Sequence, residues 1–411
     1  MSTANQTEIE ISLASWLRSL TPSALQEMLV LLQQPNLISF ALGLPAPEFF
    51  PLEELAQAME NTLRLGPKTL QYNPSLPILK SHIVELMKER GVSCHEDQIF
   101  LTGGAQQGLS LLAHLFLEQG RPVVSEELIY TGFQQVLLPF QAAKRTVPTD
   151  LDSGMDVDAV RYHLERGNRP AFIYAITEGH NPCGVSMHPD KRSRLVDLAR
   201  DYQVPIIEDD AYGFLSYDDK STPALRALDD KWVCYVGSFS KTLAPALRAG
   251  WLVVSEELMT PLSIIKESID INSTTLAQRL VESYLDMGHM PARLNKLRRE
   301  YQRRRDAMLA ALQEHLPPQS YWSKPENGFF IWVKLPESLD VNELLEIAVK
   351  TEQVAFIPGD AFRVQEDGPH TKYVRLNFSH CTPETIAEGV QRLGRALRHL
   401  QDEDVPARAV S

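Results

Sequence analysis

Short apolar runs alternate with amphipathic stretches between about residues 99 and 255. Apolar runs bounded by polar turns predict buried strands, and apolar positions at helical spacing predict helices that cover a sheet. Each predicted helix lies between two predicted strands, so helical crossovers in a largely parallel sheet are the simplest topology. The predicted strands are Ile99–Thr102, Pro122–Val124, Ala171–Ile176, Pro205–Glu208, Val233–Val236 and Gly250–Val254, and the predicted helices are Ala105–Leu117, Val157–Arg166 and Lys191–Tyr202.

The pattern changes beyond about residue 290. Residues 293–316 predict one long charged helix, whose basic run we interpret as a solvated face because the whole chain is acidic. The last helix is predicted to begin at Thr382 and Pro383, an N-cap followed by proline at the first helical position. Between these helices lie the predicted strands Gly328–Leu335, Val354–Ile357 and Tyr373–Phe378.

These patterns predict an α/β fold with a large domain, whose mostly parallel sheet is flanked by helices, and a smaller α+β domain. We expect an N-terminal arm at residues 1–45, shared between the small domain and a dimer interface. The large cofactor-binding domain is expected at residues 46–290 and the small C-terminal domain at residues 291–411.

Composition and net charge exclude several classes of protein and kinds of binding partner. The 411 residues are 44% hydrophobic and 23% charged, which excludes disordered, collagen-like and disulfide-rich secreted classes. A net charge of −13 argues against a nucleic-acid partner. The four cysteines form no C-x-x-C pair, so neither a metal site nor a disulfide framework is predicted. Without a signal-peptide pattern or a membrane-length apolar run, we expect a cytoplasmic protein that acts on small molecules.

Lys241 lies in the most informative segment, VGSFSKTLAPALRAG, directly after a predicted buried strand. Desolvation and nearby cations lower the pKa of a lysine, and a neutral amine can form a Schiff base with an aldehyde. Ser238, Ser240 and Arg248 supply hydroxyl groups and a cation suited to a phosphate. By itself this constellation is also compatible with a structural role.

Two further segments support a binding site. Asp209 and Tyr212 follow a predicted strand and so lie at the carboxyl edge of the sheet, where open α/β folds bind ligands. A carboxylate there can keep a heterocyclic nitrogen protonated, although an acidic turn that caps a helix is the alternative. Gly104, Ala105 and Gln106 lead from a strand into a helix, whose free N–H groups favour a phosphate, although a tight turn without a ligand remains possible.

Taken in order, these motifs resemble the fold-type-I pyridoxal-phosphate-dependent aminotransferases of class I/II. Within them the chain is similar to the aminoadipate and kynurenine branch, which also occurs as the C-terminal domain of MocR-type regulators. The resemblance extends from about Ile38 to Leu397. It rests on GGAQQ from residue 103, Tyr130, NPCG from residue 181, EDDAY from residue 208, SFSK from residue 238 and RLNFS from residue 375.

The resemblance implies that Lys241 forms the internal aldimine with pyridoxal 5′-phosphate and then moves the α-proton of the substrate. Asp209 would pair with the pyridine nitrogen. Tyr212 and Asn181 would contact the ring oxygen. Tyr130 would stack on the ring, where simple core packing is the alternative.

The resemblance also implies which residues bind the phosphate and the substrate. Gly104, Ala105, Gln106, Ser238, Ser240 and Arg248 would surround the phosphate. Arg375 would clamp the α-carboxylate of an amino acid or a 2-oxo acid, a role that a planar guanidinium fulfils well. Tyr72 would reach the partner's phosphate across the interface of a homodimer with shared active sites.

Some residues depart from the family pattern. The loop that begins at Tyr72 lacks the usual glycines, and Asn327 replaces one of a usual glycine pair. Glu178 and His180 replace neutral residues ahead of Asn181. Loop hydrogen bonding is the simpler explanation of both side chains. The alternative is that they contact substrate, with Glu178 selecting a cationic side chain or His180 acting as a second acid or base.

The leading interpretation is therefore an aminotransferase. A pyridoxal-phosphate lyase, cyclase or oxidase acting on a modified amino acid is the alternative within the same fold. A non-catalytic effector domain is less compatible with the chain, because only about 40 residues precede the first family-like segment, too few for a winged helix.

Overall fold

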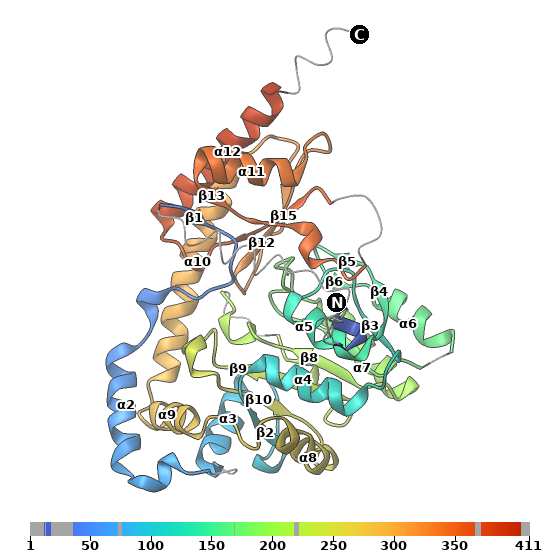
Figure 1. Ribbon diagram of the computed structural model, residues 1–411, viewed down its shortest axis with the longest axis vertical. Coiled ribbons are helices and arrows are strands. Elements are labelled where there is room, and N and C mark those ends of the chain that lie inside the picture. The colour runs from blue at the N-terminus through green and yellow to red at the C-terminus, as the bar shows by residue number, and fades with distance from the viewer. Residues whose placement is uncertain are drawn as a thin grey trace, which may run out of the picture.

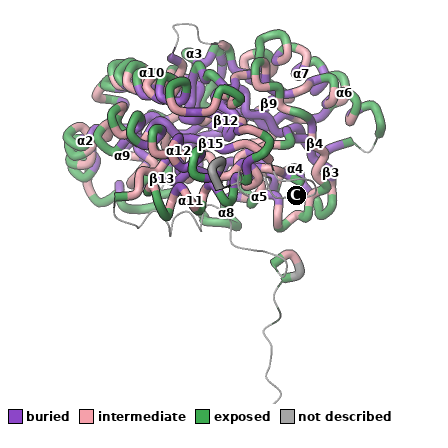
Figure 2. Tube along the Cα trace, turned by 90° about the horizontal axis from the view of Figure 1, so that it is seen from above, coloured by how far each residue is buried: buried purple, intermediate pink, exposed green. Residues whose placement is uncertain are grey.

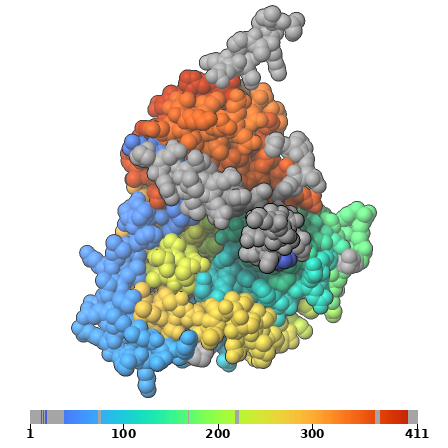
Figure 3. Space-filling view, in the orientation of Figure 1, coloured from blue at the N-terminus to red at the C-terminus, as the bar shows by residue number. Residues whose placement is uncertain are grey.

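The computed structural model describes residues 36–403 except 73–75, 168, 218–221 and 366–370, and near the N-terminus residues 12 and 14–17. The described chain forms two lobes (Figures 1 and 3). The lower lobe is built on a seven-stranded sheet and the upper lobe on a four-stranded sheet. Helix α10 (Met290–His315) runs from one lobe into the other. Among the described residues, no helix is long and apolar enough to cross a membrane.

The large sheet has the strand order β2-β10-β9-β8-β7-β3-β4. Strand β10 is antiparallel to both neighbours, whereas the remaining neighbours are parallel to each other. All strands except β10 therefore end at one edge of the sheet. The bounds are β2 (Ile99–Thr102), β3 (Pro122–Glu126), β4 (Ala143–Val147), β7 (Ile173–Ala175), β8 (Ile206–Asp209), β9 (Val233–Ser238) and β10 (Gly250–Val253).

Helices cover both faces of this sheet because successive strand residues point to opposite sides. Val236 and Leu252 pack in the core beneath α4, whereas Tyr235 and Val253 pack in the core beneath α3 and α9. Buried residues accordingly fill the centre of the molecule and exposed ones lie on the outer helices (Figure 2). The helices are α2 (Leu52–Arg64), α3 (Pro77–Glu89), α4 (Ala105–Phe116), α5 (Thr131–Leu137), α6 (Val157–Glu165), α7 (Pro189–Tyr202), α8 (Met259–Asp270) and α9 (Thr275–Asp286).

The upper lobe contains an antiparallel sheet of order β11-β12-β15-β14. Ile331 and Leu376 pack in the core formed with α10, α11 and α12. Trp332 faces the other way and packs with Cys183 and Val185 of the lower lobe. The bounds are β11 (Tyr321–Trp322), β12 (Phe330–Lys334), α11 (Val341–Glu352), β13 (Val354–Ala355), β14 (Ile357–Pro358), β15 (Tyr373–Asn377) and α12 (Pro383–Glu403).

Two short pairings complete the fold. Strand β1 (Ile38–Ser39) pairs in parallel with β13, so the segment that follows residue 36 belongs to the upper lobe. Strands β5 (Thr149–Asp150) and β6 (Gly154–Met155) form a hairpin beside the large sheet.

The structure confirms the predicted fold class and finds every predicted strand and helix. One predicted strand is divided, because β13 pairs with β1 whereas β14 pairs with β15. Edge strand β4 went unpredicted because its sequence, AKRTV, has no apolar run. The domain boundaries stay a prediction. Residue 290 begins the helix that both lobes share, and much of the predicted arm at residues 1–45 lies outside the described residues.

Candidate active site

A cavity of about 360 Å³ lies where the parallel strands end and the upper lobe meets the sheet. Asp209 ends β8, Lys241 follows β9, and Arg375 reaches the cavity from β15 of the upper lobe. This edge is where open α/β sheets bind ligands. The cavity brings together most of the residues predicted from sequence: Ala105, Gln106, Tyr130, Asn181, Asp209, Tyr212, Ser238, Ser240, Lys241, Arg248 and Arg375.

Lys241 carries its amine into this cavity, where Nζ donates a hydrogen bond to the carbonyl oxygen of Gly43 at 2.9 Å. Burial lowers the pKa of Lys241 to about 8, helped by the charges of Arg375 and Arg248 and opposed by Asp209. An ordinary lysine, with a pKa of about 10.4, is less than ~1% neutral at pH 8. Lys241 is about half neutral there, and the neutral amine is the form that attacks an aldehyde or accepts a proton.

Asp209 provides the negative charge of the site. Its Oδ2 accepts a hydrogen bond of 2.7 Å from the Tyr174 hydroxyl. Burial raises the pKa of Asp209 to about 6, while the bond from Tyr174 opposes the rise, so the carboxylate remains mostly ionised at pH 7. Burial also raises the pKa of Tyr130 and Tyr212, so both hydroxyls keep their protons and can donate hydrogen bonds. The Asp209 carboxylate can therefore hold a protonated ring nitrogen, and a tyrosine hydroxyl can donate a hydrogen bond to a ring oxygen.

A phosphate cradle lies at the N-terminus of α4. None of the described side chains caps this helix, so its first N–H groups remain available to a ligand. Gly104 has φ +91°, and a Cβ there would lie 2.8 Å from Nη2 of Arg248. Ser238 and Ser240 line the same cavity, linked by a bond of 3.1 Å from the Ser240 N–H to the Ser238 hydroxyl. Glycine, helix N–H groups, hydroxyls and one cation together fit a phosphate monoester such as that of pyridoxal phosphate.

Arg375 occupies the opposite end of the cavity. Its Nη1 donates to Oδ1 of Asn181 at 2.8 Å, and its Nη2 donates to the carbonyl oxygen of Ala41. The guanidinium carbon lies 4.2 Å from the centre of the Phe330 ring, a stacking geometry that orients the planar group. The Nε atom is buried and has no hydrogen-bond partner among the described residues. Arg375 is thus held in place with a donor left for a carboxylate.

Besides Thr131, Ala211 and Pro245, the remaining cavity wall is a set of apolar residues. These residues come from three separated segments of the chain: the turn after β1, the end of β7 and the upper lobe. They include Leu42, Leu44, Ile176, Phe330, Ile357, Ala361 and Phe362.

Four predicted site residues do not line the cavity: Gly104, which precedes α4 beside it, Glu178, His180 and Tyr72. Glu178 is buried and accepts a hydrogen bond of 2.7 Å from Nη2 of Arg192. His180 is also buried, with Nε2 3.0 Å from Oε2 of Glu126. Both are engaged within the protein, as the loop hydrogen-bonding alternative expected, and neither lines the cavity. Tyr72 is 77% exposed and lines a second cavity.

Sequence reasoning missed several residues of the site. Tyr174 lies inside a predicted strand, where strand periodicity alone does not distinguish a tyrosine bonded to Asp209 from a core residue. Gly43 carries the hydrogen-bond acceptor of Lys241 on its backbone, so no side-chain pattern reveals it. Phe330 lies three residues after Asn327, but the sequence does not show that the Phe330 ring packs against Arg375, because the fold brings these two residues together.

Residues 37–393 match the family model described as aminotransferase class I and II. The chain is 37% identical to the 2-aminoadipate transaminase of Thermus thermophilus, over 92% of this chain and 94% of that protein. It is 35% identical to aromatic-amino-acid aminotransferase 1 of Thermococcus litoralis, over 92% and 91% of the two chains.

A solved structure shares the fold. The crystal structure of LysN, the α-aminoadipate aminotransferase of Thermus thermophilus, superimposes with a TM-score of 0.87 at 34% identity. The match covers 95% of this chain and 98% of that one, and that crystal contains N-(5′-phosphopyridoxyl)-L-leucine.

The lowered pKa of Lys241 predicts how the apoprotein captures pyridoxal phosphate. Capture should accelerate as pH rises, because the neutral amine becomes more abundant, with a midpoint near pH 8 and a plateau about one pH unit above that midpoint. Replacing the neighbouring cation, in Arg375→Met, should move the midpoint to higher pH. Stopped-flow absorbance from pH 6 to 10.5 measures this rate, with a free lysine derivative as the control. A rate that rises through pH 10 without a plateau would contradict the assigned environment of Lys241.

Proposed function

We propose that Lys241, Asp209 and Arg375 carry out the reaction of this chain, which belongs to the class I and II aminotransferases. The chain is a pyridoxal-phosphate-dependent enzyme that moves an amino group between an amino acid and a 2-oxo acid. One observation supports the assignment most strongly. A single cavity holds a buried lysine of lowered pKa, a buried carboxylate and a buried guanidinium that retains an unpaired donor.

Lys241 and Asp209 take complementary roles in proton transfer. Bound pyridoxal phosphate supplies an aldehyde carbon and an electron-withdrawing ring that stabilises negative charge at the substrate α-carbon. Asp209 keeps the ring nitrogen protonated, because its carboxylate is mostly ionised at neutral pH. Lys241 accepts the α-proton at Nζ and returns it, which requires a basic group whose pKa lies near the working pH.

The remaining residues bind and orient. The N–H groups at the start of α4, with Ser238, Ser240 and Arg248, hold the phosphate. Tyr212 and Asn181 contact the ring oxygen. Tyr130 lines the cavity and is assigned to the ring face. Arg375 holds the α-carboxylate at the upper-lobe end of the cavity.

The cavity favours amino acids with apolar or aromatic side chains. Lys241, Arg248 and Arg375 are its described cations, and the cofactor and the α-carboxylate engage all three. Leu42, Ile357 and the other apolar wall residues can bury a hydrocarbon side chain, which stabilises binding by about 1.5–3 kcal/mol. A cationic substrate selected by Glu178 is not favoured, because the Glu178 carboxylate is already bonded to Arg192 outside the cavity.

The alternative chemistries have less support. A lyase, cyclase or oxidase would share the cofactor contacts described above. The relatives named here are aminotransferases of aromatic amino acids and of 2-aminoadipate, which favours transamination. The cytoplasmic location and the lack of a nucleic-acid partner stay predictions from composition.

The working unit is proposed to be a homodimer. Tyr72 lines a second cavity of about 430 Å³ with Met259 and Ile271. Tyr72, Ile264 and Ile271 are each at least 65% exposed, so this surface displays large apolar side chains to solvent. A second copy covering the surface would bury them, and Tyr72 would then contact the partner's phosphate site.

A single half-reaction tests the proposed function. The loaded enzyme, incubated with one amino acid and no oxo acid, should convert its cofactor to pyridoxamine phosphate. Leucine or phenylalanine should react with a kcat/KM at least about tenfold above that of aspartate, which cannot use the apolar wall. Chromatography of the released cofactor measures the product.

Two variants control this experiment. Lys241→Ala should form no pyridoxamine phosphate, whereas Lys191→Ala, at a lysine on α7 that does not line the cavity, should behave like the unaltered enzyme. An amino acid that changes the cofactor spectrum without yielding pyridoxamine phosphate would instead indicate the lyase or oxidase chemistry.

Mixed dimers test the role of Tyr72. Tyr72→Ala and Lys241→Ala should each have little activity alone. After co-refolding in equal amounts they should regain about a quarter of the activity of the unaltered enzyme, because each heterodimer contains one intact site. Light scattering should report the mass of two chains. Activity no greater than the mean of the two parents would show that Tyr72 does not act on the partner's site.

A further inference from the structure

Two departures noted in the sequence meet at the boundary between the lobes. Glu178 lies in the loop after β7 of the lower lobe, and Asn327 lies just before β12 of the upper lobe. The Asn327 Nδ2 donates a hydrogen bond to Oε2 of Glu178, and its Oδ1 accepts one of 3.2 Å from the Ser186 hydroxyl. Glu178 is 5% exposed and Asn327 2% exposed. The side-chain amide of Asn327 thus crosses the boundary between the lobes and forms hydrogen bonds with two residues of one lower-lobe loop, Glu178 and Ser186.

The two backbones approach closely at this point. Gly179 has φ +52° and Gly328 has φ +76°, a region that favours glycine. A Cβ on Gly179 would lie 2.9 Å from the Gly328 Cα, and a Cβ on Gly184 would lie 2.3 Å from the carbonyl oxygen of Phe330. The segments are therefore in direct backbone contact, and a small shift of one lobe must move the other or break the Glu178–Asn327 bond.

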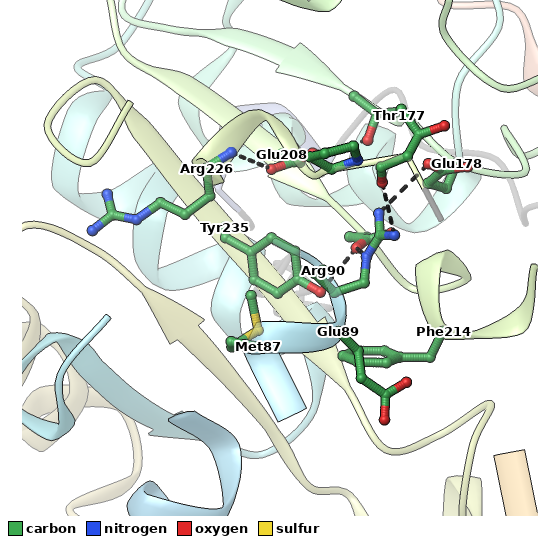
Figure 4. A network of polar contacts seen from close by, with 12 residues as sticks. Met87, Glu89, Arg90, Thr177, Glu178, Glu208, Phe214, Arg226 and Tyr235 are labelled. Carbon is green, nitrogen blue, oxygen red and sulfur yellow. Dashed lines mark hydrogen bonds and ion pairs between the residues drawn. The ribbon is translucent and has the colours of Figure 1, made fainter. Parts of the chain in front are cut away.

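Glu178 is fixed firmly from the lower-lobe side. Nη2 of Arg192 lies 2.7 Å and Nη2 of Arg90 3.5 Å from Glu178 Oε1. Arg90 also bonds Asp210 through Nε at 2.8 Å, and Figure 4 shows its guanidinium directed toward Glu178. Two buried cations and two buried carboxylates balance in charge, and ion pairs between buried groups are strong because the surroundings have a low dielectric constant. Glu178 is thus an anchor onto which Asn327 docks.

Both segments lead directly to the substrate end of the active site. Asn181 follows Glu178 by three residues and accepts the 2.8 Å hydrogen bond of Arg375. Phe330 follows Asn327 by three residues, and its ring lies 4.2 Å from the Arg375 guanidinium carbon. Two of the contacts that orient Arg375, from Asn181 and from Phe330, therefore come from opposite sides of the Glu178–Asn327 bond.

We propose that Glu178 and Asn327 are positioning residues that hold the two lobes in register and thereby orient Arg375 toward the substrate α-carboxylate. The inference rests on the proposed role of Arg375. The apolar contact of Trp332 with Cys183 and Val185 also joins the lobes, but apolar contact is non-directional and does not fix their relative position. Directional hydrogen bonds also join the lobes where Tyr217 donates through its N–H to the Glu326 carbonyl and through its hydroxyl to the Gly328 carbonyl. The bond from Asn327 to Glu178 is the one that ties this segment to the loop that carries Asn181.

Asn327→Ala tests the proposal with the least damage, because Glu178 keeps its arginine partners. Arg375 binds the α-carboxylate in the ground state and the transition state alike, so its misorientation should raise KM for the amino acid about tenfold while kcat changes less than about threefold. The affinity for pyridoxal phosphate should stay unchanged. The matched control is Ser323→Ala, a buried residue of the same segment whose hydroxyl accepts the Trp332 N–H within the upper lobe. Its KM should change less than about twofold.

Exchanging the carboxylate and the amide of the Glu178–Asn327 pair distinguishes loss of their hydrogen bond from a general loss of stability. Asn327→Asp places a second carboxylate against Glu178 and should raise KM by more than Asn327→Ala does. Adding Glu178→Gln restores a donor facing an acceptor and restores the charge balance, so the double variant should return to within about threefold of the unaltered KM. Hydrogen exchange should show residues 177–186 and 326–330 both exchanging faster in Asn327→Ala, whereas Ser323→Ala should affect only the second segment.

Failure of the Arg375 role and failure of the positioning role of Glu178 and Asn327 give different results. If Arg375→Ala leaves KM unchanged, the proposed role of Arg375 fails. If Arg375→Ala raises KM but Asn327→Ala and Ser323→Ala have equal KM values, the positioning role fails. It also fails if the double variant shows no recovery, or if faster exchange in Asn327→Ala is confined to residues 326–330.

Discussion

The burial of the Lys241 amine beside two guanidinium groups is the constraint on which the site depends. Desolvation and the charges of Arg375 and Arg248 disfavour the protonated amine, which leaves a base and nucleophile near neutral pH. Such a cluster of cations requires anions: Asp209 within the cavity and the phosphate and carboxylate of the ligands. The two-lobed fold meets this need by bringing Lys241 and Asp209 from the sheet edge and Arg375 from the upper lobe.

Much of this arrangement could be predicted from the sequence, because the parallel sheet follows a local pattern. Val233–Ser238 and Ile206–Asp209 are apolar runs that end in chemistry-bearing residues, so their position at a sheet edge follows from the run itself. The family resemblance then assigned roles to residues such as Arg375, which local pattern alone leaves ambiguous. Strand β4 went unpredicted because an edge strand that is only partly buried does not need an apolar sequence.

The remaining features depend on contacts between distant segments. Glu178 looked like a possible substrate contact because it lies three residues before Asn181, but its partners Arg192 and Asn327 come from a helix and from the other lobe. Tyr174 and Gly43 serve the site through single hydrogen bonds that leave no sequence signature. In both cases charge and hydrogen-bond satisfaction in the folded chain, rather than sequence proximity, decide what a residue does.

Covalent capture of the cofactor is the sharpest test of the role of Lys241. Borohydride reduction of the enzyme loaded with pyridoxal phosphate, followed by peptide mass spectrometry, locates the lysine that bonds the aldehyde carbon. We expect one phosphopyridoxyl group per chain, on the peptide that contains Lys241. A phosphopyridoxyl group on another lysine, or none at all, would contradict it.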